Sequence, residues 1–284
     1  MNILFVCTGN TCRSPMAEGY LKSAMLQSIN VKSCGFLSSG DCASENSVLA
    51  MQDLGVDISA HRSNVISAED IDWADKIICL SDNHRDTLLS LGVASNKLSV
   101  LGDGIPDPFG QDLLVYKTTA LAIADAIDGI IFSGEILQFT ASNTLPEDFE
   151  SIAMLEEITF SEPWSLNALL ESFAHGTRFI CAKQGDALAG YMGLSAVAGE
   201  GYVTNIAVFP EFKRRGVASL ILFYAFSLAR KLGLEFISLE VRESNNSAIA
   251  LYQKFGFCKE GIRKNFYDNP KEDAIIMTRR LNFK

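Results

Sequence analysis

Residues 7–15 read Cys7-Thr8-Gly9-Asn10-Thr11-Cys12-Arg13-Ser14-Pro15. They follow an apolar, strand-like run over residues 3–6 and precede a helical pattern over residues 16–26, and Pro15 suits the first turn of that helix. A loop between a strand and a helix aims several backbone N–H groups at one point, where the helix dipole adds about half a positive charge. We therefore predict an anion site in this loop that stabilises both a phosphate and a thiolate.

The residue types in the loop predict a nucleophile with its partners. Cys7 stands at the base of the loop, and the planar guanidinium of Arg13 can hold two phosphate oxygens while the thiolate attacks phosphorus. Ser14 is expected to donate a hydrogen bond to that thiolate. Gly9 and Asn10 are residue types that tolerate the left-handed backbone of a tight anion nest. The phosphate-binding residues predicted here are Thr8, Gly9, Asn10, Thr11, Cys12 and Ser14.

The rest of the first half alternates strand-like and helical patterns. Further apolar runs cover residues 76–80 and 98–101, and a helical pattern covers residues 113–127. This alternation predicts an α/β fold with a parallel sheet that helices cover on both faces. The run over residues 98–101 leads into a turn-rich stretch that ends in Asp107-Pro108.

The segment from Cys7 to Glu18 resembles the signature of the low-molecular-weight protein tyrosine phosphatases, and the resemblance covers residues 1–133. It implies that Asp107 is the general acid that protonates the leaving group. It also implies that Asp107 then acts as the base on the water that hydrolyses a phosphocysteine intermediate, without a metal ion.

Two positions depart from the tyrosine-specific pattern. Thr11 stands where an aliphatic residue is usual, and Phe109-Gly110 follows the Asp-Pro pair where aromatic residues, often tyrosines, are usual. Both departures resemble the bacterial protein-arginine phosphatases, so Thr11 and Phe109 are the predicted specificity residues and protein phosphoarginine is the predicted substrate. Phosphotyrosine and a small-molecule phosphate stay open as alternatives.

Cys12 lies in the same loop as Cys7, and two interpretations of it remain. The two thiols can form a reversible disulfide under peroxide, or Cys12 can be a small buried apolar residue.

Composition narrows the range of partners. The chain has 284 residues and a formal net charge of -10, which disfavours direct nucleic-acid binding and attraction to anionic membranes. It has no basic leader at its start and no apolar run of the roughly 20 residues that cross a bilayer. Seven cysteines without a C-x-x-C pair predict reduced thiols in the cytoplasm rather than a zinc site. The histidines show no metal-ligand spacing and are expected in packing or at the surface: His61, His84 and His175.

The pattern changes after Gly134, so we place two domains at residues 1–134 and 135–284. The second is expected to be a mixed α+β domain whose first helix begins near Pro146. Strands are predicted at residues 136–140, 178–182, 187–194, 202–209, 236–241 and 274–278, and helices at 217–232 and 247–255.

Residues 210–218 form a second basic, glycine-containing turn between a strand and a helix. Backbone N–H groups at the start of that helix can bind a pyrophosphate, with Arg214 and Arg215 adding charge. The turn alone is a weak signal, because basic turns are commonly just solvated.

The downstream residues strengthen the signal. Residues 239–242, followed by Asn245, Tyr252 and Gly256-Phe257, resemble the GNAT acetyltransferase superfamily. Pro163-Trp164-Ser165, residues 204–208 and residues 272–274 resemble the bacterial ribosomal-protein alanine N-acetyltransferases, over residues 136–280.

This resemblance implies acetyl-CoA as cosubstrate, Glu240 as the general base for the acceptor's α-ammonium group and Tyr252 as the acid that protonates the CoA thiolate. Two departures are Lys213, where Gln or Arg is usual, and a small residue at 218 that is not glycine. The implied cofactor-binding residues are Ile206, Ala207, Val208, Arg214, Arg215, Gly216, Val217, Ala218, Ser219 and Asn245.

The sequence as a whole predicts two active enzymes on one chain. The expected partners are phosphorylated proteins and the N-terminal alanine of a ribosomal protein, with another N-terminus or a lysine as the alternative acceptor. A competing hypothesis makes one half a binding module only. Cys7, Asp107 and Glu240 argue against it, because a module that only binds needs neither nucleophile nor acid.

Overall fold

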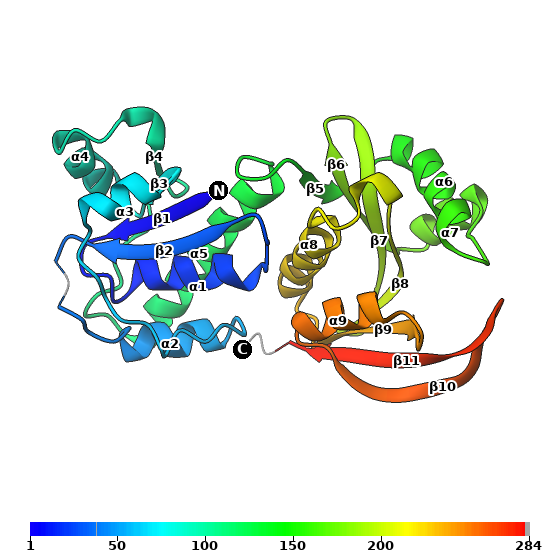
Figure 1. Ribbon diagram of the computed structural model, residues 1–284. Coiled ribbons are helices and arrows are strands. Elements are labelled where there is room, and N and C mark those ends of the chain that lie inside the picture. The colour runs from blue at the N-terminus through cyan, green and yellow to red at the C-terminus, as the bar shows by residue number, and fades with distance from the viewer. Residues whose placement is uncertain (38, 282–284) are drawn as a thin grey trace. The chain divides into compact units, whose positions relative to one another are not determined.

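The computed structural model describes residues 1–37 and 39–281, and the chain divides into two compact units. The first unit spans Met1–Ile130 and the second begins at Ile131 (Figure 1). None of the helices in the described ranges is long and apolar enough to cross a membrane.

The first unit is built on a four-stranded parallel sheet in the order β2-β1-β3-β4. Its central strand β1 carries the apolar run of residues 3–6, which is wholly buried because a parallel sheet is covered on both faces. The strands are β1 (Asn2–Cys7), β2 (Asn30–Gly35), β3 (Lys76–Cys79) and β4 (Leu98–Val100).

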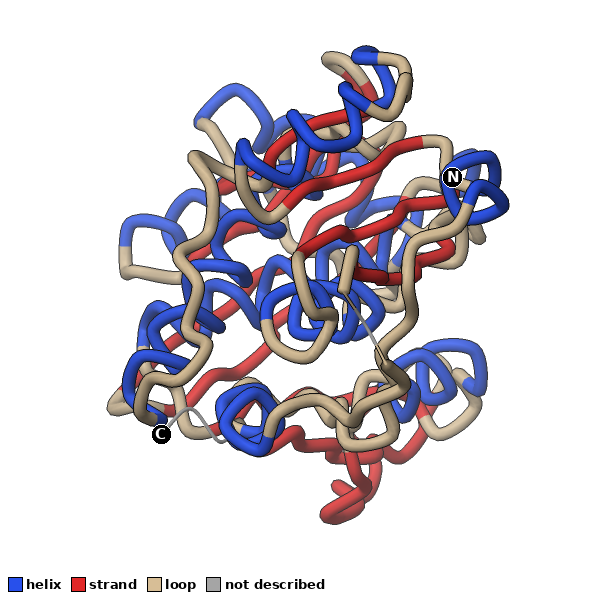
Figure 2. The backbone as a smooth tube through the Cα atoms, turned by 90° about the vertical axis from the view of Figure 1, so that its left-hand side faces the viewer, coloured by secondary structure: helices blue, strands red, loops and turns tan. Residues whose placement is uncertain are grey.

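Helices lie on both faces of this sheet, as predicted (Figures 1 and 2). Leu4 and Val6 of β1 pack with Ala74, which directly follows α3, and with Leu88 of α4. The helices are α1 (Arg13–Ser23), α2 (Glu45–Gln52), α3 (Ala68–Trp73), α4 (Asp82–Ser90) and α5 (Leu113–Phe132).

The second unit is a mixed α+β domain, as predicted, around a seven-stranded sheet in the order β10-β11-β9-β8-β7-β6-β5. All neighbouring strands are antiparallel except β8 and β9, which are parallel. The strands are β5 (Thr140–Asn143), β6 (Arg178–Gln184), β7 (Ala187–Val197), β8 (Glu200–Val208), β9 (Phe236–Arg242), β10 (Cys258–Asp268) and β11 (Lys271–Arg280). The helices are α6 (Phe149–Thr159), α7 (Leu166–Ala174), α8 (Val217–Leu232) and α9 (Asn246–Lys254).

The parallel pair β8–β9 is joined over three residues only. Glu200–Tyr202 of β8 pair with Phe236–Ser238 of β9, and the pairing stops there although both strands continue. The splayed part of β8, residues 203–208, is therefore bonded to β7 on one side and to no strand on the other. Such a splay leaves backbone N–H and C=O groups to a ligand.

Two predicted elements are wrong in their bounds. The strand expected at residues 136–140 begins only at Thr140, because Ile136 and Phe139 are buried as anchors in a turn that follows the left-handed Gly134. The helix expected at residues 16–26 begins at Arg13 and ends at Ser23, and Met25 beyond it adopts a left-handed φ of 52°.

Candidate active sites

Cys7 is the last residue of β1 and stands at the base of the loop that follows. The Cys7 thiol is 3% exposed, and its Sγ lies 3.0 Å from Ser14 Oγ. The backbone N–H of Asn10 also donates to Cys7 Sγ, at 3.3 Å. A backbone N–H thus donates to the sulfur, and a hydroxyl lies within hydrogen-bond distance of it.

Asn10 is the internal brace of this loop. It is wholly buried and takes the left-handed φ of 53°, whereas Gly9 does not, so the predicted left-handed position falls on Asn10 alone. Its Nδ2 donates to Ser14 Oγ and to Ser33 Oγ, both at 2.8 Å, and its Oδ1 accepts from Asn64 N at 2.9 Å. A network with every member satisfied fixes the loop before any ligand arrives.

Arg13 joins this loop to the turn-rich stretch after β4. Its Nη2 lies 2.5 Å from Asp107 Oδ2, and its Nη1 donates to the carbonyl of Ile105 at 3.1 Å. The Arg13 side chain is 7% exposed and that of Asp107 is 48% exposed. The Nε of Arg13 is buried and meets no partner among the described residues, which makes it a donor for an anion. The predicted nucleophile, arginine and acid therefore lie at one site.

The two predicted specificity residues lie in different surroundings. Thr11 is half-buried, with Oγ1 3.7 Å from Cys12 Sγ. Phe109 is 73% exposed, and its backbone N–H donates to Asp107 Oδ1 at 3.2 Å. An exposed phenyl ring two residues from the predicted general acid is available to a substrate.

Cys12 is a buried free thiol held by other elements. Its Sγ lies 3.4 Å from Tyr116 Oη of α5 and 3.6 Å from Ser44 Oγ. Burial, and then this contact with Cys12, raise the pKa of Tyr116 to about 12. The disulfide between Cys7 and Cys12 stays a prediction.

Two histidines contact the loop, which sequence patterns did not indicate. His84 of α4 is buried, with Nε2 3.0 Å from Thr8 Oγ1 and Nδ1 2.8 Å from Ser81 Oγ. Burial, and then the charge of Arg13, lower the pKa of His84 to about 4. His61 Nε2 lies 2.9 Å from the carbonyl oxygen of Asn10.

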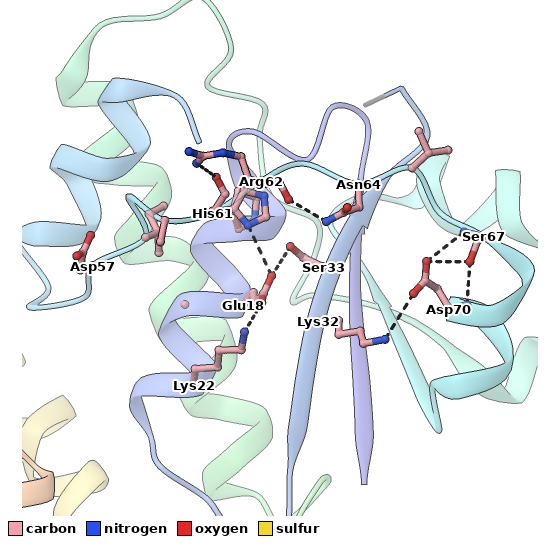
Figure 3. Close-up of a pocket in the computed structure, with 15 residues that line it drawn as sticks. Glu18, Lys22, Lys32, Ser33, Asp57, His61, Arg62, Asn64, Ser67 and Asp70 are labelled. Atoms are coloured by element: carbon pink, nitrogen blue, oxygen red, sulfur yellow. Dashed lines mark hydrogen bonds and ion pairs between the residues drawn. The ribbon is translucent and has the colours of Figure 1, made fainter. Parts of the chain in front are cut away.

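His61 also lines a pocket of about 770 Å³ beside α1 and β2, shown in Figure 3. There Glu18 accepts from Ser33 Oγ at 2.6 Å, pairs with Lys22 and lies 3.9 Å from His61 Nδ1. Ser33 and His61, which line this pocket, both contact Asn10. Neither histidine carries a spacing motif, so no local signal marks them.

In the second unit, the basic turn before α8 has the backbone of an anion site. Arg214 and Gly216 take left-handed φ values of 63° and 88°, and no side chain caps the first turn of α8, which begins at Val217. The N–H groups of Val217, Ala218 and Ser219 suit the phosphates of acetyl-CoA.

The side chain of Arg215 contacts other protein groups in this structure. Its guanidinium stacks on the rings of Phe139 and Phe212 and donates to Gln138 Oε1 and Gln184 Oε1. These partners lie in the turn before β5, in the turn before α8 and at the end of β6, and a role of Arg215 in binding phosphates stays a prediction.

The other predicted cofactor residues lie in or beside the splay. Ile206 and Val208 are in the splayed part of β8, which pairs with β7 but not with β9, and the side chain of Ala207 between them is buried in the core. Asn245 caps α9, with Oδ1 accepting from Ala248 N at 3.2 Å, and this leaves its Nδ2 as a donor.

Glu240 and Tyr252 lie on β9 and α9. Glu240 is exposed and lies in the part of β9 that no longer pairs with β8. Its Oε1 lies 2.9 Å from Nη1 of Arg263. Tyr252 is 5% exposed, and burial raises its pKa above its usual range. Tyr267 of β10, which sequence reasoning missed, lies near both. Its charge adds to burial in raising the pKa of Tyr252, and the charge of Glu240 adds to burial in raising the pKa of Tyr267. No group of metal-ligand type gathers within the described ranges.

Comparison with known proteins agrees with this division. Residues 2–130 match the family described as Low molecular weight phosphotyrosine protein phosphatase, and residues 144–257 match the Acetyltransferase (GNAT) family. A protein-arginine-phosphatase of Geobacillus stearothermophilus is 38% identical over 136 residues, which cover 44% of this chain and 90% of the relative. The ribosomal protein bS18-alanine N-acetyltransferases of Salmonella typhimurium and Haemophilus influenzae are 34% and 33% identical, over 46% of this chain and 89% and 90% of each relative.

Proposed function

The chain belongs to the low molecular weight phosphotyrosine protein phosphatase family through its first unit and to the GNAT acetyltransferase family through its second, and on this premise we propose that one bifunctional enzyme dephosphorylates protein phosphoarginine and acetylates the N-terminal alanine of a ribosomal protein. All seven cysteines carry free thiols, which supports the cytoplasm as its compartment.

In the first reaction the Cys7 thiolate attacks phosphorus while Arg13 and the loop N–H groups hold the phosphate oxygens. The phosphorus–nitrogen bond breaks, and Asp107 gives its proton to the leaving guanidine nitrogen. Asp107 then takes a proton from water, whose oxygen attacks phosphorus and releases phosphate and the thiolate. The observation that carries this proposal is that Asp107, from the loop after β4, meets Arg13 beside Cys7 and Ser14.

Phosphoarginine is favoured over phosphotyrosine by Thr11 and Phe109, and by the likeness to a protein-arginine-phosphatase. The half-buried hydroxyl of Thr11 is a hydrogen-bonding group that an aliphatic residue would lack.

The test is phosphate release by the full chain, under reducing conditions, from two peptides that differ only in phosphoarginine or phosphotyrosine. We expect a higher kcat/KM for the phosphoarginine peptide than for the phosphotyrosine peptide. We expect Thr11→Ile to lower this preference for phosphoarginine. A higher kcat/KM for phosphotyrosine in the wild type would reject the proposed substrate.

In the second reaction acetyl-CoA supplies the acetyl group as a thioester. Backbone groups of residues 206–208 and of the turn before α8 would hold it, as their unpaired geometry suits. Glu240 takes the proton from the acceptor's ammonium group so that the amine attacks the thioester carbonyl, and Tyr252 protonates the departing thiolate.

Acceptor choice is tested with peptides that begin with alanine, compared by mass spectrometry with the same peptides blocked at the N-terminus and carrying one internal lysine. We expect acetylation of the free N-terminus alone. Equal acetylation of the blocked peptides would identify lysine as the acceptor.

A further inference from the structure

Glu156 of α6 is a carboxylate with no solvent exposure, and three elements donate to it. Its Oε2 accepts from the backbone N–H of Trp164 at 2.7 Å. Its Oε1 accepts from Asn205 Nδ2 at 2.7 Å and from the hydroxyl of Tyr191. The donors come from the segment before α7, from β8 and from β7.

A buried carboxylate is costly unless donors satisfy it, and well-packed apolar residues often replace buried charged groups without loss of stability. The position of these donors is therefore informative. Asn205 lies in the splayed part of β8, directly before Ile206, while Trp164 lies in the segment that leads into α7.

The splayed part of β8 has no strand paired with its outer edge. It pairs with β7 alone, and the register of that pairing shifts between Met192 and Leu194, opposite the residues around Asn205. The side chain of Asn205 therefore adds a bond from this part of the strand to helix α6.

We propose that Glu156 is a positioning residue. It fixes the splayed part of β8, where acetyl-CoA would bind, relative to the segment that contains Trp164. It touches neither cosubstrate, and it acts through Asn205 on the backbone groups of Ile206 and Val208, and through Trp164 N on the neighbouring segment. This inference rests on the proposed acetyl transfer.

Two variants of the full chain separate the two contacts of Glu156, one with Asn205 and one with the backbone N–H of Trp164. Asn205→Ala removes only the bond to β8, so the dissociation constant for acetyl-CoA, measured by calorimetry, should rise about tenfold, as for one hydrogen bond to a charged group. The KM for the alanine peptide should stay at the wild-type value. Glu156→Leu removes both contacts and should raise both the dissociation constant for acetyl-CoA and the KM for the alanine peptide.

Asp148→Asn is the matched control, because Asp148 is a buried carboxylate of the same unit that bonds Lys183 and Leu145 N, away from the splay. It should lower the melting temperature and change neither constant. An Asn205→Ala variant that binds acetyl-CoA like the wild type would overturn the proposed positioning role of Glu156. A wild type that binds acetyl-CoA without acetylating peptides would reject only the proposed acceptor, and a wild type that binds none would overturn both proposals.

Discussion

Asp107 Oδ2 lies 2.5 Å from Nη2 of Arg13, so the loop after β4 closes on the arginine of the nucleophile's loop. The arginine is buried, whereas about half of the aspartate side chain meets solvent. The carboxylate is thus held beside the phosphate-binding group and remains accessible to a leaving group.

Asp107→Asn should lower kcat for a phosphoarginine peptide about 10²–10⁴-fold, because an amide cannot protonate the leaving nitrogen. The loss should be much smaller for para-nitrophenyl phosphate, whose leaving group needs no proton. Asp103→Asn, in the same loop and exposed, serves as the control. Equal losses on both substrates would reject the general-acid role.

Ser14→Ala should slow the alkylation of Cys7 by iodoacetamide about 10-fold or more, since the hydroxyl 3.0 Å from the sulfur can then no longer donate a hydrogen bond to a thiolate. Alkylation is followed by mass spectrometry of the peptide that contains Cys7. The control, Ser23→Ala, removes a 2.7 Å hydrogen bond to Tyr20 at the far end of the same helix. An unchanged rate in Ser14→Ala would show that this contact does not activate the thiol.

His84 should make the first unit less stable at acidic pH. Its pKa falls from 6.5 to about 4 on folding, by burial and then by the charge of Arg13. Between these values the unfolded chain binds a proton that the folded chain does not, so the free energy of unfolding decreases as pH falls through this window. The full loss is up to about 3 kcal/mol.

The measurement is urea unfolding at pH 7 and pH 4.5 in a chain with Trp164→Phe, which leaves Trp73 as a fluorescent reporter of the first unit. His84→Asn should show a smaller difference between the two pH values than its parent. His175→Asn, at an exposed position, should not alter that difference. A His84→Asn chain with the parent's full difference would contradict this origin.

Tyr252→Phe should lower kcat for acetylation about 10²-fold or more and leave the dissociation constant for acetyl-CoA near the wild-type value, because only proton transfer to the thiolate is removed. Stopped assays of acetyl-peptide formation give kcat, and calorimetry gives the binding constant. Tyr202→Phe, which loses an exposed hydroxyl bonded to Glu200, is the control. An unchanged kcat in Tyr252→Phe would assign the acid to another group.

The elements predicted well from sequence are those with a strong local pattern. The wholly apolar run of β1 and the helix Val217–Leu232, which left-handed Gly216 and Gly233 flank, have such patterns. Strand β10 lacks one, because its side chains are mostly exposed and do not alternate in burial.

The candidate sites follow the same rule. Cys7, Arg13 and Ser14 stand in one short motif, so sequence alone identifies them. His84 reaches Thr8 across 76 positions and Glu156 reaches Asn205 across 49, and only the packing of distant elements brings these pairs together.

The central claim, two separate enzymes on one chain, is tested most directly by assaying both reactions in Cys7→Ser and Glu240→Gln variants of the full chain. We predict that Cys7→Ser abolishes phosphate release and keeps wild-type acetylation, and that Glu240→Gln does the reverse. Unchanged phosphate release in Cys7→Ser, or the loss of both activities from either substitution, would contradict the account.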